Sequence, residues 1–188
     1  MEDIKIVVVG DSGVGKTSLL MKYNNWDMPK VSTSAFMLYP TKKIINGKQI
    51  QLDLYDIDVK EKFDTRDYRI SSYDYPKIAD VVLICFSLKS LTSFTNVSKK
   101  WIPEVKKYCP NVPIILVGTH HDVPDQDREV KLETTQTMSK VDICEYFCCA
   151  SIPDKSESDH IAIIFDTVCK LVLDKRNPPI VRINGLDS

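Results

Sequence analysis

A glycine-rich loop directly after a β-branched apolar run constrains the fold of this chain more than any other feature. The run covers Ile4 to Val9, and the next residues are Gly10-Asp11-Ser12-Gly13-Val14-Gly15-Lys16-Thr17, which contain three of the six glycines. Glycines let backbone N–H groups close around phosphate oxygens, and a helix that begins beside the loop turns its positive end toward the same anion. The pattern therefore predicts a P-loop between a first strand and a first helix.

The residues of this pattern also predict which groups contact a nucleotide. Lys16 is predicted to reach the outer phosphates as a point charge, and the Thr17 hydroxyl is predicted to ligate Mg²⁺. A glycine-rich turn without a ligand is the alternative, but the helical spacing of Leu19, Leu20 and Tyr23 after the loop supports the P-loop. The predicted phosphate-contacting residues are Ser12, Gly13, Val14, Gly15, Lys16, Thr17 and Ser18.

Composition narrows the class of protein. The 188 residues suit one domain, expected to be a monomer, and the formal net charge of -1 argues against a nucleic-acid partner. The six cysteines contain no C-x-x-C pair, so we interpret them as reduced core residues of a cytoplasmic protein. The apolar runs 4–9 and 81–86 are too short for a signal peptide or a membrane span, so no membrane segment is expected.

Apolar runs of strand length alternate with helix-period segments, which predicts an α/β fold with helices on both faces of a mostly parallel sheet. Asn46-Gly47 is a hairpin signal, so the strands on either side are expected to be antiparallel, giving one antiparallel edge strand. The six expected strands are 4–9, 41–45, 49–55, 81–86, 112–117 and 143–149. One helix is expected to begin near Lys16, and further helices are expected at 91–108, 130–139 and 159–173. Pro103 is expected to kink the helix at 91–108 or to mark a boundary within it.

Two stretches in the second half carry a family resemblance. Trp101-Ile102-Pro103-Glu104-Val105 and the segment from Cys109 to Thr119 resemble the Rho branch of the Ras-superfamily small GTPases. The likeness runs from about Ile4 to Leu173, although Asp11-Ser12 is more similar to the Rab branch. The resemblance implies a P-loop GTPase G domain over residues 1–176, followed by a tail at 177–188, with GTP or GDP and Mg²⁺ as cofactors.

The resemblance further implies a guanine-reading motif at Thr119-His120-His121-Asp122, where the Rho pattern is Thr-Lys-x-Asp. Asp122 is expected to accept both N–H groups of the guanine edge, a bidentate contact that adenine does not offer. His120 replaces the lysine whose stem covers the base. Met28 stands where the family stacks an aromatic ring, and it either lies on the base or fills the core. The remaining implied base contacts are Cys149, Ala150 and Ser151.

The metal site implied by the resemblance consists of Thr17, Asp56 and a switch I hydroxyl. That hydroxyl belongs to Ser34 in one alignment and to Thr33 in the other. Effectors are expected to bind two switch segments, from Ser32 to Tyr39 and from Asp58 to Tyr73, and exchange factors or a dissociation inhibitor are further expected partners. The ending 184–188 holds no cysteine for a C-a-a-X signal, so no membrane anchor is expected within this chain.

The second switch departs from the family pattern. The family reads Asp-Thr-Ala-Gly-Gln, whereas this chain reads Asp56-Ile57-Asp58-Val59-Lys60. Val59 is β-branched and does not freely adopt the glycine conformation that donates to the γ-phosphate. Lys16 and Lys60 are the catalytic candidates, and Lys60 is predicted to be defective because lysine has no acceptor to orient the attacking water.

Several functions therefore remain open from the sequence. The first hypothesis is a Rho-like GTP/GDP switch with impaired hydrolysis. The others are a hydrolase that uses Asp58 or Glu61, a pseudo-GTPase scaffold that binds nucleotide weakly, and a P-loop kinase for small molecules. The intact Lys16-Thr17 pair argues against the scaffold, and the absence of an arginine-rich lid argues against the kinase.

Overall fold

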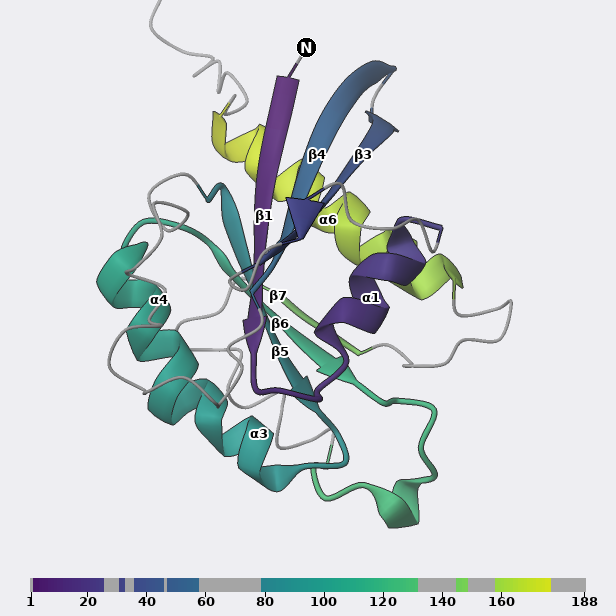
Figure 1. The fold of residues 1–188 in the computed structure, drawn as a ribbon, viewed down its shortest axis with the longest axis vertical. Coiled ribbons are helices and arrows are strands. Elements are labelled where there is room, and N and C mark those ends of the chain that lie inside the picture. Colours follow the sequence, from purple (N-terminus) through teal and green to yellow (C-terminus); the bar gives the residue numbers. More distant parts are fainter. Residues whose placement is uncertain are drawn as a thin grey trace, which may run out of the picture.

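A central sheet with helices on both faces organises the molecule (Figure 1). This computed structural model describes residues 2–25, 31–32, 36–45, 47–57, 79–131, 145–148 and 158–176. The strands are β1 (Glu2–Gly10), β2 (Val31–Ser32), β3 (Met37–Ile45), β4 (Lys48–Asp56), β5 (Val81–Ser87), β6 (Ile114–Thr119) and β7 (Glu145–Cys148). The helices are α1 (Lys16–Tyr23), α3 (Leu91–Asn96), α4 (Ile102–Tyr108) and α6 (Ser158–Arg176).

The sheet has the order β2-β3-β4-β1-β5-β6-β7. The predicted hairpin is confirmed, since β3 pairs antiparallel with β4, while β1 pairs in parallel with both β4 and β5. The described residues form seven strands, one more than the six expected. The additional strand, β2, is two residues long and pairs antiparallel with Leu38 and Met37, so it is too short to produce a periodic sequence signal.

Two strand boundaries differ from the expectation because of prolines. β3 begins at Met37 rather than 41 and contains Pro40, which is tolerated because this strand lies near the sheet edge. β6 begins at Ile114 rather than 112, since Pro113 has no N–H to donate to the ladder. β7 lies within the expected range 143–149, and most of the helix expected at 130–139 lies outside the described residues.

The apolar side chains of β1 alternate between two cores. Ile4, Ile6 and Val8 pack in the core beneath α1 and α6, whereas Val7 and Val9 pack in the core beneath α3 and α4. The two helix pairs lie on opposite faces of the sheet in Figure 1. Burial on both faces explains why the central strands are continuous apolar runs rather than alternating ones.

The crossover between β5 and β6 is helical from Leu91 to Tyr108 but changes its winding in the middle. A π-helical turn covers Val97–Trp101, and α4 starts directly after it with Pro103 in its first turn. Proline cannot donate a backbone hydrogen bond inside a helix, so the wider turn before it separates two regular segments. The change of winding confirms Pro103 as a boundary within the predicted helix. Trp101, the last residue of the π-helical turn, is only 1% exposed.

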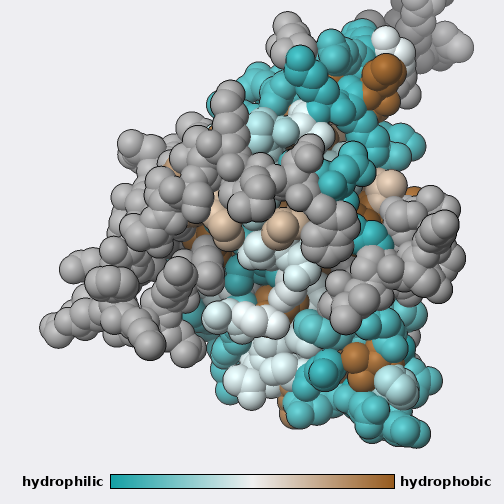
Figure 2. All heavy atoms as spheres, turned by 45° about the vertical axis from the view of Figure 1, so that its right-hand side comes forward, coloured by the Kyte–Doolittle hydropathy of each residue, from teal (hydrophilic) through white to brown (hydrophobic). Residues whose placement is uncertain are grey.

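The described surface is mostly hydrophilic on the face shown in Figure 2, with separate hydrophobic spots. The large exposed hydrophobic residues in the described part lie on β3, α3 and α6, and are Ile44, Leu91 and Ile163. They therefore form no shared apolar patch along one element. No helix among the described residues is long and apolar enough to span a membrane.

Candidate functional site

The carboxyl ends of four neighbouring strands converge on one edge of the sheet. β4, β1, β5 and β6 are adjacent, and they end at Asp56, Gly10, Ser87 and Thr119. In open α/β sheets ligands bind outside the carboxyl ends of strands, where chain connections leave in opposite directions. Here the chain moves from β4 across β1 to β5, so this edge is the candidate site.

The loop between β1 and α1 requires glycine at its turning points. A Cβ at Gly10 would lie 2.2 Å from the Cys85 carbonyl oxygen, so β1 and β5 approach each other closely only because Gly10 has none. Gly13 and Gly15 have φ values of 77° and 94°, which L residues with side chains rarely adopt. Alternating positive φ values form the kind of backbone concavity that binds anions.

Lys16 is held against this loop by backbone carbonyls. Its Nζ donates to the Gly10 oxygen at 3.0 Å and to the Asp11 oxygen at 2.9 Å, and the residue is only 4% exposed. An ammonium group has three N–H donors, so these two bonds are compatible with a further one to a phosphate oxygen. The loop therefore combines a backbone concavity with one fixed positive charge.

The first residues of α1 meet the end of β4. Thr17 Oγ1 donates to Asp56 Oδ2, and Asp56 is completely buried. The Ile57 N–H donates to the Val8 oxygen at 3.1 Å, which fixes the chain directly after Asp56 beside β1. A hydroxyl and a carboxylate are hard oxygen donors of the type Mg²⁺ takes, so these residues fit the metal that the sequence predicts.

Thr119 ties the end of β6 to the P-loop. Its Oγ1 lies 2.5 Å from the Val14 oxygen and 3.0 Å from the Phe86 oxygen, and the residue is 1% exposed. One hydroxyl thus joins three segments that are far apart in the sequence. The predicted guanine-reading motif is therefore joined to the P-loop at Thr119.

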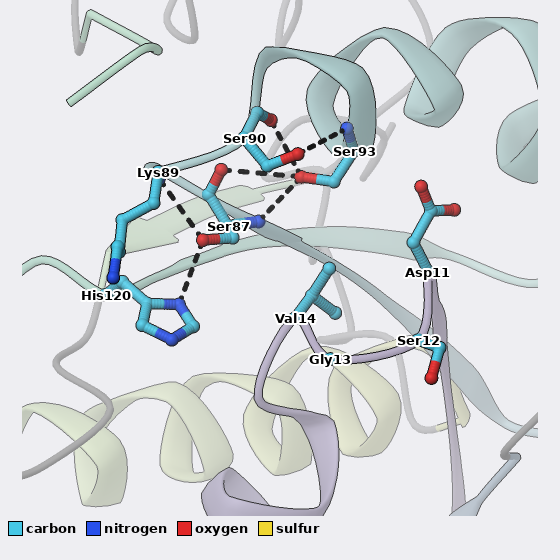
Figure 3. A pocket seen from close by; sticks show the side chains of 9 residues that line it. All are labelled: Asp11, Ser12, Gly13, Val14, Ser87, Lys89, Ser90, Ser93 and His120. Atoms are coloured by element: carbon cyan, nitrogen blue, oxygen red, sulfur yellow. Dashed lines mark hydrogen bonds between the residues drawn. The ribbon is translucent and has the colours of Figure 1, made fainter.

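His120 follows in a left-handed conformation, with φ of 60°. Its Nδ1 lies 3.0 Å from Ser87 Oγ, so the ring is turned toward the end of β5 (Figure 3). Burial lowers the pKa of His120 below the usual 6.5, the Asp122 carboxylate opposes that shift, and the Lys89 ammonium adds to it. Burial therefore favours the neutral form of this histidine.

A polar cavity lies beside the P-loop at this edge. Figure 3 shows that its side chains come from the loop, the end of β5, the start of α3 and the turn after β6. Ser93 Oγ lies 3.0 Å from the Ser87 nitrogen and 2.8 Å from the Ser90 oxygen, which fixes the turn that leads into α3. The lining residues are Asp11, Ser12, Gly13, Val14, Ser87, Lys89, Ser90, Ser93 and His120.

Comparisons with known proteins agree with this architecture. A sequence model described as the Ras family matches residues 5–173. The chain belongs to the Ras family. It is similar to the Rho-related GTP-binding protein RhoB of Homo sapiens, Mus musculus and Rattus norvegicus. Each is 33% identical over 185 residues, which cover 92% of this chain and 90% of the relative. The fold is thus a G domain, and the chain is a Rho-like small GTPase.

The site residues predicted for this Rho-like GTPase fall into two groups. The described ones come together at the edge of the sheet, where Ser12 and Asp122 are exposed. This first group consists of Ser12, Gly13, Val14, Gly15, Lys16, Thr17, Ser18, Asp56, Thr119, His120 and Asp122. The second group lies outside the described residues and consists of Met28, Ser34 with its alternative Thr33, Val59, Lys60, Cys149, Ala150 and Ser151.

The structure of the Rho-like GTPase adds a contact that the sequence did not reveal. The Asp11 carboxylate accepts hydrogen bonds from Asn96 Nδ2 at 2.6 Å and from Trp101 Nε1 at 2.8 Å. Trp101 belongs to the stretch that carries the Rho resemblance, but nothing in the sequence links it to a residue 90 positions earlier. The π-helical turn brings its indole N–H to the P-loop.

Proposed function

We propose that this Rho-like GTPase binds guanine nucleotide with Mg²⁺ and works as a molecular switch whose GTP hydrolysis is impaired. The observation that carries the proposal is the contact between Thr17 and Asp56 beside the buried Lys16, with Asp122 in the turn that follows β6 at the same edge of the sheet. A guanine nucleotide requires three kinds of group: backbone N–H groups around its phosphates, hard oxygen ligands for its Mg²⁺, and a carboxylate for the guanine base.

Each group has a defined part in binding. Lys16 and the P-loop backbone hold the phosphates, while Thr17 and Asp56 hold Mg²⁺, with Ser34 as the proposed third metal residue. Mg²⁺, when bound, neutralises part of the negative charge on the phosphate oxygens. Asp122 accepts the two N–H groups of the guanine edge, and Thr119 keeps this carboxylate in register with the P-loop.

The side chains at positions 59 and 60 are the reason to expect impaired hydrolysis. A water-positioning glutamine offers both an acceptor and a donor, whereas Lys60 offers donors only. Intrinsic hydrolysis in this class is already slow, on the order of 10⁻⁴ per second. Loss of the acceptor therefore leaves a protein that stays in the GTP state and presents its switch segments to effectors for long periods.

The identity of the nucleotide on the purified full chain tests the proposal. The protein is denatured and the supernatant is analysed by anion-exchange chromatography. GTP is the expected result, whereas GDP would mean that the chain hydrolyses GTP in spite of Val59 and Lys60. The matched variant Lys60→Gln, combined with Val59→Gly, restores the family residues and is expected to shift the bound nucleotide from GTP to GDP.

A second candidate, a scaffold that binds nucleotide weakly, is favoured by one observation. Nδ1 of the His120 ring contacts the hydroxyls of Ser87 and Thr119, so this ring nitrogen is bonded to the protein rather than to a ligand. Purified protein without nucleotide would support the scaffold. Lys16→Ala separates the two functions, because a switch loses nucleotide and partner together whereas a scaffold keeps its partner.

A further inference from the structure

An arginine side chain contacts the turn that carries Asp122, in addition to the hydrogen bond of that turn from the Val123 N–H to the His120 oxygen at 3.3 Å. Arg128 Nη2 donates to the His121 oxygen at 2.6 Å, and Arg128 Nε donates to the Val123 oxygen at 3.0 Å. These carbonyls belong to the residues immediately before and after Asp122. The guanidinium thus fixes the backbone on both sides of the carboxylate, while Asp122 itself is exposed.

The chemistry of this contact requires an arginine. The third edge of the guanidinium pairs with Asp125, with 2.5 Å between Arg128 Nη1 and Asp125 Oδ1. The Arg128 side chain is 13% exposed, whereas the Asp125 side chain is 90% exposed. A planar guanidinium has five donors in a fixed fork and serves two carbonyls and a carboxylate at once, which the point charge of lysine cannot do.

The segment that carries Arg128 is itself anchored. The Glu129 and Val130 N–H groups donate to the Leu88 oxygen at 3.0 and 3.1 Å, and Glu129 Oε2 accepts from the Leu91 N–H at 2.7 Å. These bonds attach the segment to the connection between β5 and α3. Arg128 therefore links the turn at Asp122 to a segment that is itself bonded to the connection between β5 and α3.

We propose that Arg128 is a positioning residue that determines guanine selectivity by holding Asp122 in register. The inference rests on the proposed function, since it requires Asp122 to read the base. The carboxylate gains its bidentate contact only when both oxygens face the two N–H groups of guanine, and a displacement of about 1 Å is enough to lose much of such a contact. Arg128 touches no nucleotide in this proposal and acts through the backbone of Asp122.

The test compares the affinities of GDP and inosine diphosphate (IDP), which lacks the 2-amino group that Asp122 is expected to bind. Competition against a fluorescent GDP analogue, in excess Mg²⁺, gives both dissociation constants for the full chain. The wild type is expected to prefer GDP by about tenfold or more, as for a hydrogen bond to a charged group. Arg128→Ala is expected to lower this preference by about fivefold or more, with a much smaller change in IDP affinity.

Two control variants separate positioning from general stability. Arg176 likewise donates to a backbone carbonyl, that of Asp3 at 2.8 Å, and to a carboxylate, that of Asp80 at 2.6 Å. Arg176→Ala removes comparable bonds far from the site, so it is expected to keep the wild-type preference for GDP. Asp122→Ala gives the lower limit of the preference for GDP over IDP. Adding Arg128→Ala to that variant is expected to cause no further loss of this preference.

The outcomes distinguish the two proposals. A wild type that binds GDP no better than ADP would overturn the guanine-binding function and this inference with it, whereas one that binds GDP better than ADP but no better than IDP would overturn the inference alone. A wild type that prefers GDP, together with an Arg128→Ala variant that keeps the full preference, would overturn the inference alone. If Arg128→Ala does not fold, Arg128→Lys decides the question, because it keeps the charge and the aliphatic stem but not the fork.

Discussion

The hydrogen bond between the P-loop and the π-helical turn gives a quantitative prediction. Trp101→Phe removes the indole N–H that lies 2.8 Å from Asp11 Oδ1 and leaves the carboxylate with Asn96. A hydrogen bond to a charged group contributes about 1.5–3 kcal/mol to the free energy of unfolding. The smaller ring also leaves a cavity at a site that is 1% exposed, which adds about 1 kcal/mol. The expected total loss is about 2.5–4 kcal/mol.

A double-mutant cycle isolates the hydrogen bond from the cavity. Asp11→Ala removes the acceptor, and the cycle with Trp101→Phe is expected to give a coupling energy of about 1.5–3 kcal/mol, because the cavity term cancels. Urea unfolding followed by far-UV circular dichroism, at one fixed GDP and Mg²⁺ concentration, provides the four free energies. This signal does not depend on the tryptophan that is removed.

A distant acid supplies the control for this cycle. Asp80 contacts Arg176 and the Lys5 N–H rather than the P-loop, so Trp101→Phe and Asp80→Asn are expected to be additive. A coupling energy below about 0.5 kcal/mol between Asp11 and Trp101 is within the usual error of additivity. That result would refute the reasoning, since it would mean that the carboxylate is equally well solvated without the indole.

Three further predictions address the loop and its neighbours. Thr119→Val removes the hydroxyl beside the Val14 oxygen, so we expect a loss of about 1–3 kcal/mol in unfolding free energy, measured by urea titration. Gly10→Ala places a Cβ 2.2 Å from the Cys85 oxygen, so it is expected to shift β1 and abolish tight GDP binding, as read by GDP release during gel filtration. The lowered pKa of His120 means that the unfolded state takes up a proton at about pH 6.5 before the folded state does. Stability is therefore expected to be full above that pH and to fall below it, and His120→Asn should reduce this slope in pH-dependent thermal unfolding.

Local patterns were enough to predict the sheet and the P-loop. The parallel strands are continuous apolar runs because both faces of the sheet are covered, and the hairpin follows from the turn chemistry of Asn46-Gly47. The loop glycines are required by the positive φ of Gly13 and by the close approach of Gly10 to Cys85. Each of these features is signalled by residues near one another in the sequence, even though the close approach of Gly10 to Cys85 is itself a long-range contact.

The contacts that hold the site together could not be predicted in the same way. Asp11 meets Trp101 across 90 positions and Thr119 meets Val14 across 105, and both contacts depend on which strands become neighbours. Arg128 reaches its two carbonyls over a few residues, but only after a short turn at 125–127 reverses the chain. Sequence spacing specifies none of these geometries, because side-chain direction is set by the tertiary fold.

These supports imply that nucleotide affinity and fold stability depend on each other. Trp101 of the π-helical turn supports the P-loop through Asp11, Thr119 joins that loop to β6, and Arg128 holds the turn that carries Asp122. A ligand that binds only the folded state adds RT ln(1 + [L]/Kd) to the unfolding free energy, about 2.7 kcal/mol at a hundredfold excess over Kd. A variant that weakens binding thus loses this contribution as well as its own contacts. A stability loss that vanishes without nucleotide therefore belongs to the site, and a loss that persists belongs to the fold.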